Sequence, residues 1–344
     1  MTETLKDGPV GLADDPDIRI TAHFYERIFG VPPATLRRAP GGLALLGGPP
    51  LPLRPAPAKH DAVPGDDHGA VPGEHDGASA GYGAASGRYP ALAVALAWGA
   101  IVAAGPHPDG GVDLYSMNRL TDRCTSLDEV PDWALDAVEA LRAHADPPPA
   151  ARMVVNRELP AETGLLCGAE TVCAAAMALG DLHGPPIASA ACASGPEYLA
   201  ALHSRPRHAL LITEDGPEQV PFDLAAAGLR LLVIDTGVAE EASAPSRVPS
   251  DPGADVVERA VSALRAGFPA GLGPLLTEAH VPGRPILDLA LSAARSAGAL
   301  GGRALGRCAV ALVPVNAVPA VRAEVTARLI PHAPRPPRFL TATT

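Results

Sequence analysis

A chain of 344 residues with a formal net charge of −11 is long enough to fold as two lobes. Hydrophobic residues make up 47% of the sequence and charged residues 19%, which excludes a wholly disordered chain. The acidic balance and the lack of a basic stripe argue against a nucleic-acid partner, because nucleic-acid affinity comes largely from cations on phosphates.

The cysteines and the apolar runs indicate the cellular compartment that we expect for this protein. Five cysteines without a CxxC spacing predict neither a disulfide framework nor a zinc site. Residues 1–17 are acidic and polar, so we expect no signal peptide. The longest apolar run, residues 91–104, is shorter than the roughly 20 residues that a membrane-spanning helix needs. We therefore expect a cytoplasmic protein with no membrane association and no metal.

The N-terminal part predicts one helix and one strand, followed by a change of composition. Residues 18–30 carry apolar side chains at helical spacing before two prolines, and residues 42–46 form an apolar run typical of a buried strand. Residues 49–90 are rich in Pro, Gly, Asp, His and Ser, and residues 62–69 are imperfectly duplicated in residues 70–77. The His and acidic side chains could ligate a metal or form part of a lid. Because such chain offers little fixed geometry, we favour a mobile, solvated insertion.

Beyond the insertion, the hydrophobic pattern is regular. It predicts strands at residues 91–104, 112–117, 152–159, 208–213, 230–235 and 308–315. It predicts helices at residues 132–144, 167–179, 255–266, 285–297 and 319–329. Strands interspersed with paired helices, without strict alternation, indicate an α+β fold.

Several segments keep the order and spacing of known kinase motifs. Residues 24–30 and 39–47 lie where those enzymes have an F–FG segment and the signature APGRVNLIGEHTDY, and residues 159–169 occupy the place of the phosphate loop PxGAGLSSSAA. Residues 302–303 and 307–314 are similar to the flanks of a third motif, GGGFGG. From about Phe24 to Arg328 the chain therefore resembles the galactokinase branch of the GHMP kinases (galacto-, homoserine, mevalonate and phosphomevalonate kinases).

The resemblance implies a two-lobed GHMP kinase fold. An N-terminal lobe like ribosomal protein S5 domain 2 would comprise residues 1–48 and 91–200, with residues 49–90 as the insertion. A ferredoxin-like C-terminal lobe would comprise residues 201–335. The family places its substrates in a cleft between the two lobes.

At the positions where the family has its catalytic and sugar-binding residues, this sequence has other residue types. The catalytic Arg that follows APG corresponds to Gly42, and the Glu, His and Asp that grip the sugar hydroxyls correspond by counting to Gly48, Pro49 and Leu51. Phosphoryl transfer needs a positively charged group beside the phosphoryl group that is transferred, and Gly42 has no side chain to supply that charge. Galactose recognition is therefore expected to be absent.

The phosphate loop is changed as well. It keeps Gly164 and Leu165, but its three serines become Leu166, Cys167 and Gly168, which removes hydroxyl ligands for phosphate and Mg²⁺. Glu162 replaces a loop glycine, and a carboxylate about 5 Å from a phosphate charge costs around 3 kcal/mol at an effective dielectric of 20. The third motif also lacks about four residues between positions 303 and 308. We expect no ATP, no Mg²⁺ and no kinase activity.

One feature of the family's active site is half kept. Counting back from His208, the family's catalytic aspartate corresponds to Glu197, which is chemically competent as a base. The alternative is an ordinary surface glutamate. Tyr198 follows directly and is a candidate for substrate contact.

Further candidates each have a plainer interpretation. Cys167 would lie at a helix N-terminus, where the pKa of a thiol can fall, but it could simply be a small buried replacement for Ser. Arg37 and Arg38 could reach an anion in the cleft, or could be exposed arginines that flank a helix. His280 and Arg284 resemble the family's SHxSLR segment and are interpreted as structural remnants.

Three functional hypotheses follow. The first is an ATP-independent enzyme or enzyme subunit that acts on an anionic small metabolite in specialised biosynthesis, with Glu197 as base in the intramolecular displacement of a phosphate or sulfate leaving group. The second is a non-catalytic pseudokinase that serves as partner or scaffold in a heteromeric complex. The third is a small-molecule kinase with a rebuilt site. We expect a protein partner or a homo-oligomer in the first two cases.

Overall fold

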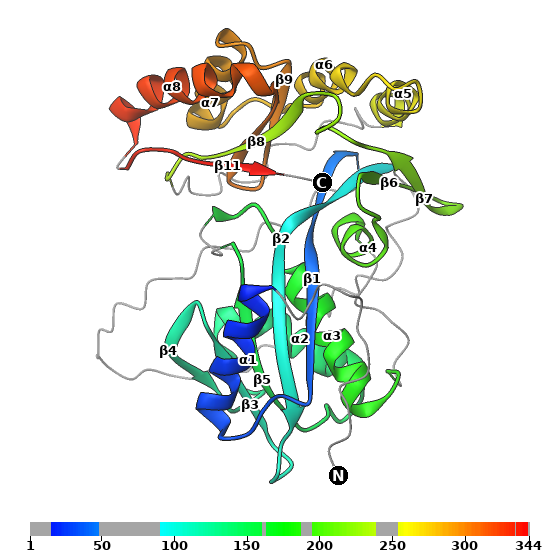
Figure 1. Cartoon of the computed structure of the whole chain (residues 1–344), viewed down its shortest axis with the longest axis vertical. Coiled ribbons are helices and arrows are strands. Elements are labelled where there is room, and N and C mark those ends of the chain that lie inside the picture. Colours follow the sequence, from blue (N-terminus) through cyan, green and yellow to red (C-terminus); the bar gives the residue numbers. More distant parts are fainter. Residues whose placement is uncertain are drawn as a thin grey trace, which may run out of the picture.

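The computed structural model describes residues 15–47, 90–159, 163–186, 195–238, 254–333 and 335–342. Figure 1 shows a mixed sheet at one end of the long axis and a smaller sheet at the other, with the long strands β1 (Thr35–Gly47) and β2 (Ala91–Pro106) extending between them. The expected insertion at residues 49–90 lies outside the described residues, apart from Pro90.

The first sheet is built around β2. Its strand order is β4-β3-β5-β2-β6-β7, and β1 pairs with β2 off this path. The β3–β5 pair is parallel and the other pairs are antiparallel. The remaining strands are β3 (Val112–Ser116), β4 (Arg119–Cys124), β5 (Ala151–Arg157), β6 (His208–Thr213) and β7 (Gly216–Pro221). Thus β6 and β7, although they follow residue 200 in the chain, hydrogen-bond into the first sheet.

Helices cover both faces of the first sheet. On one face α1 (Pro16–Phe29) buries Tyr25 against Ala103 of β2 and Val154 of β5. The side chain of Asp15 caps the start of this helix, and Gly30, at a φ of +73°, ends it. On the other face lie α2 (Leu135–His144) and α3 (Ala169–His183), which bury many small side chains against β2 and β5. The abundant alanines let these helices approach the sheet closely.

The second sheet is antiparallel throughout. Its order is β11-β8-β10-β9, with β8 (Leu229–Asp235), β9 (Gly301–Leu305), β10 (Cys308–Pro314) and β11 (Arg338–Ala342). One face packs on α7 (Pro285–Ser296) and α8 (Val318–Leu329). The other face packs on α5 (Ala254–Arg265) and α6 (Leu272–Glu278), in a core that also contains apolar side chains of β1 and β2. One continuous core therefore joins the two sheets.

The α+β, two-lobed expectation is confirmed, and most of the predicted elements lie within a few residues of their expected positions. Strand β1 is longer than expected, because it begins at Thr35 rather than near residue 42. Its pairing with β2 shifts between Pro40 and Gly41, because Ala97 and Trp98 of β2 have no partner in β1, and Pro40 lies opposite Gly99 beside this bulge. This irregularity lies next to the positions of the expected catalytic signature.

Candidate functional site

The loop that leads into α3 turns its apolar side chains inward. Glu162 lies outside the described residues, but Gly164 adopts a φ of +58°, and Leu165 and Leu166 are buried in the core that joins the two sheets. The methyl groups of Leu166 lie directly against Gly41 of β1. Both leucines of this loop therefore contribute to packing, including Leu166, which lies at a position where a serine is expected from the family motif.

The turn between β9 and β10 closes on this loop. The backbone N–H of Arg307 donates to the Gly164 carbonyl at 3.0 Å, and the buried thiol of Cys308 donates to the Thr163 carbonyl at 3.2 Å. A Cβ atom at Gly306 would overlap the Gly164 carbonyl oxygen, so the two backbones are in direct contact. The turn between β9 and β10 thus packs against the loop.

Carboxylates surround the N-terminus of α3. Gly168 is the N-cap residue, and a Cβ there would fall 2.5 Å from Cγ of Asp136, a residue of α2 that is only 4% exposed. In the first turn Glu170 is 1% exposed, and its Oε1 accepts a hydrogen bond of 2.7 Å from Arg157. Arg157 also lies 4.0 Å from Asp136, so one guanidinium faces two buried carboxylates. Burial raises the pKa of Glu170, and the Arg157 charge opposes that rise.

Glu197 lies in the first turn of α4 (Pro196–His203), where the helix meets β1. A Cβ at Gly42 would overlap the Glu197 carbonyl oxygen and fall 2.5 Å from its carbonyl carbon. The residue is 5% exposed, and the Oε2 atom of its carboxyl group has no hydrogen-bond partner in the described part of the chain. Burial raises its pKa, while the backbone N–H groups of Glu197 itself and of Ala44 favour the charged form.

Two other candidates lie near Glu197. Cys167 is exposed rather than buried, and the surrounding protein atoms, followed by the Glu197 charge, raise the pKa of its thiol to about 12. The helix N-terminus therefore does not lower the pKa of this thiol, because desolvation by the surrounding atoms and the neighbouring carboxylates outweigh its effect. Tyr198 is half-buried beside the α2–α3 core, and burial raises the pKa of its hydroxyl group. At neutral pH it is a neutral donor and acceptor.

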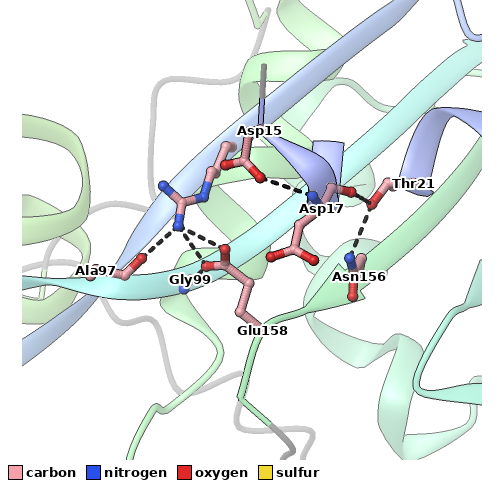
Figure 2. Close-up of polar contacts among 8 residues, drawn as sticks. Asp15, Asp17, Thr21, Ala97, Gly99, Asn156 and Glu158 are labelled. Carbon is pink, nitrogen blue, oxygen red and sulfur yellow. Dashed lines mark hydrogen bonds and ion pairs between the residues drawn. The ribbon is translucent and has the colours of Figure 1, made fainter. Parts of the chain in front are cut away.

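The two arginines of β1 are held by carboxylates. Arg37 forms two hydrogen bonds of 2.6 Å with Asp181 of α3. Arg38 binds Glu158 at 2.7 and 2.9 Å and donates to the Ala97 carbonyl at 2.5 Å. Figure 2 shows the Glu158 carboxylate facing Gly99, whose N–H donates to it at 2.5 Å. Both arginines are residues of β1 and do not flank a helix in the sequence, and each is paired with a carboxylate within the chain.

The residues that sequence reasoning missed are Asp136, Arg157 and Glu170. They come from α2, β5 and α3, and no local pattern connects them. The one sequence signal is an acidic residue at the second position of an otherwise apolar helix, which alone reads as a favourable helix start. Among the described residues, no group of His, Cys, Asp and Glu could hold a metal ion. Within the same ranges, no helix has both the length and the apolar character to cross a membrane.

Comparisons with known proteins show which fold this architecture belongs to. No family model and no curated protein sequence matches the chain. Among solved structures, Lactococcus lactis galactokinase in complex with galactose is similar at a TM-score of 0.69 and 16% identity, over 94% of this chain and 97% of that chain. A mevalonate kinase is similar at a TM-score of 0.57 and 12% identity, over 90% of this chain and 99% of that chain. A putative sugar kinase from Campylobacter jejuni is similar at a TM-score of 0.56 and 12% identity, over 90% of this chain and 95% of that chain. The chain therefore has the GHMP kinase fold, in the form that galactokinase also adopts.

Proposed function

We propose that this protein does not use ATP and that it acts as an enzyme or enzyme subunit on a small metabolite in biosynthesis. The observation that carries the proposal is the acidic N-terminus of α3, where Asp136 and Glu170 face a single guanidinium, Arg157. A helix N-terminus attracts phosphate through its dipole and its free N–H groups. A carboxylate about 5 Å from a phosphate charge opposes that attraction by around 3 kcal/mol at an effective dielectric of 20.

The contact between β1 and α4 supports the same conclusion. With the Glu197 backbone against Gly42, no side chain can be placed at the position that corresponds to the family's catalytic Arg. Arg37 and Arg38 do not replace it, because each is bound to a carboxylate. In the described residues, the charges around this part of the fold suit a reaction other than phosphoryl transfer from ATP.

Glu197 supplies the chemistry of the proposed reaction. A carboxyl group whose pKa is raised by burial is a stronger base than an exposed one, and it accepts a proton more readily near neutral pH. In the proposed displacement, Glu197 takes the proton of an N–H or O–H group on the metabolite. The freed electron pair forms a bond to carbon on the same molecule. The carbon–oxygen bond breaks, and phosphate or sulfate leaves with the bonding pair.

A second function, as a non-catalytic partner subunit, is favoured by one specific contact. The Glu197 carboxyl group is stabilised by the N–H of Ala44, which links the start of α4 to β1. This role in packing would be enough to keep an acidic residue at the position without any chemistry.

Glu197→Gln separates the two functions. In a deletion strain of the source organism, we expect wild-type chain to restore the pathway product and Glu197→Gln to lose it, while circular dichroism shows an intact fold. Glu324→Gln, on the exposed surface of α8, is the matched control and should restore the product fully. Full restoration by Glu197→Gln would reject catalysis by this residue and favour the partner role.

A further inference from the structure

Three arginines gather around the turn between β9 and β10. Arg303 lies on β9, Arg307 lies in the turn, and Arg284 immediately precedes α7. Arg284 donates to the carbonyl of Gly306 in the turn itself, and Arg303 donates to the carbonyl of Leu45 in β1 at 3.1 Å. The methylene groups of Arg307 lie over Gly164, with Cδ 2.7 Å from where a Cβ would be. The cluster therefore lies where the two sheets meet.

The three charges lack acidic partners among the described residues. No ion pair joins Arg284, Arg303 or Arg307 to a carboxylate there, and the Nε of Arg303 is buried without a hydrogen-bond partner. Three acids of the same lobe are engaged elsewhere. Glu278 binds Arg259 at 2.5 Å, Asp288 binds His280 at 2.9 Å, and Asp235, which lies opposite Cys308 in the sheet, binds Arg335 at 2.9 Å.

Electrostatics make this arrangement unfavourable in isolation. Burial, followed by repulsion from the charge of Arg284, lowers the pKa of Arg303 to about 10. Backbone carbonyls satisfy single N–H groups but do not neutralise a guanidinium. All three side chains are half-buried, so each keeps some access to solvent. An anion that contacted both Arg284 and Arg303 would relieve their mutual repulsion and supply the missing acceptor.

We propose that Arg284 and Arg303, with Arg307 beside them, bind an oxyanion: the phosphate, sulfate or carboxylate group of the metabolite. This inference rests on the proposed function and deepens it by naming the substrate's charged group. Arg303 contacts Leu45, and the Glu197 carboxyl group contacts the preceding residue, Ala44. The Arg303 guanidinium and the candidate base are therefore no more than roughly 13 Å apart, a separation that one metabolite can span.

The site differs from the N-terminus of α3 in charge and in place. Arg307 lies over Gly164, at the start of the loop, whereas Asp136 lies against Gly168, at its end. A single oxyanion fits the basic end without approaching the carboxylates, but a chain of three phosphates extending along the loop would meet them. We therefore expect inorganic phosphate or sulfate to bind at least as tightly as Mg·ATP.

Calorimetric titration of the full chain tests this proposal. Inorganic phosphate, sulfate and acetate are titrated separately at constant ionic strength set with sodium chloride. Phosphate or sulfate should bind with a dissociation constant of about 1 mM or lower, and their ratio tells which leaving group the site prefers. Tighter binding of acetate would assign the site to a carboxylate instead. Arg303→Gln and Arg284→Gln should each weaken the preferred anion about 10-fold or more, because each removes a charge-assisted contact.

Arg328→Gln, which removes one exposed charge from α8, is the control for net charge and should leave the dissociation constant unchanged. If Arg303→Gln does not fold, Arg303→Lys keeps the charge and should retain part of the affinity, and Arg307→Gln should still weaken binding. Absence of anion binding in the wild-type chain, or equal binding in all variants, would overturn the inference. The proposed function fails on different grounds, namely tight binding of Mg·ATP.

Discussion

The close contact between β1 and α4 can be tested by adding one methyl group. In Gly42→Ala the new Cβ would lie 2.5 Å from the carbonyl carbon of Glu197, whereas ordinary contact begins at 3.4 Å. The backbones must therefore separate by at least 0.9 Å (3.4 less 2.5), and the overlap with the carbonyl oxygen requires more. Because both partners are backbone, no side chain can rotate to make room. Overpacking of this kind costs about 1–3 kcal/mol of unfolding free energy.

Urea denaturation at neutral pH measures the effect. The control is Gly180→Ala in α3, where a Cβ would meet nothing within 4 Å and where Ala should raise the unfolding free energy by up to about 1 kcal/mol. Gly42→Arg should be less stable than Gly42→Ala and should gain no ATP-dependent activity. The reasoning fails if Gly42→Ala is as stable as the wild-type chain, since β1 and α4 would then not be in contact.

Three other predictions concern buried and exposed charges. Arg157→Met should lower the unfolding free energy by about 3 kcal/mol at pH 7, because it leaves the buried Glu170 unpaired, and Arg157→Met/Glu170→Gln should recover most of the loss in the same denaturation assay. Burial, and then the charge of His183, lowers the pKa of His144, which is 5% exposed. The contribution of neutral His144 to the unfolding free energy is therefore complete above about pH 6.5 and is lost as the pH falls below that value. In the same denaturation assay, the stability of the wild-type chain should drop relative to that of His144→Gln between pH 7.5 and 5.5. Arg37→Gln should cost less than about 1 kcal/mol, because the Arg37 side chain is 43% exposed; a loss of 3 kcal/mol would contradict its assignment as a surface ion pair.

Elements with strong periodicity could be predicted from the sequence, and short or interrupted ones could not. The apolar run that forms β2 and the amphipathic pattern of α5 are visible in a window of about a dozen residues. The sequence does not predict strand β7, because Pro217 and Pro221 interrupt its pattern. Among the described residues it is an edge strand paired with β6, and prolines are tolerated at such an edge. Helix α4 has only eight residues and is fixed by its contact with β1 rather than by its own pattern.

The same distinction between local patterns and contacts of distant segments applies to the candidate site. Motif spacing indicates Glu197 as a candidate base, which stays a prediction, but its burial against Gly42 depends on residues that are far apart in the chain. Arg37 is a candidate for anion binding in the sequence, because its ion-pair partner Asp181 is 144 residues away and no local pattern reveals the pairing. The acidic surroundings of α3 arise in the same way, from Asp136 on a different helix. Ion pairs of this kind are set by the tertiary structure, and no local pattern encodes them.

The measurement that tests the account most directly is calorimetric titration of the purified full chain with Mg·ATP up to millimolar concentration. With the N-terminus of α3 lined by carboxylates and the Glu197 backbone packed against Gly42, we predict no binding with a dissociation constant below about 1 mM, which corresponds to roughly −4 kcal/mol. A dissociation constant in the micromolar range would contradict the account. It would mean that Asp136 and Glu170 do not oppose phosphate and that the chain is a kinase with a rebuilt site.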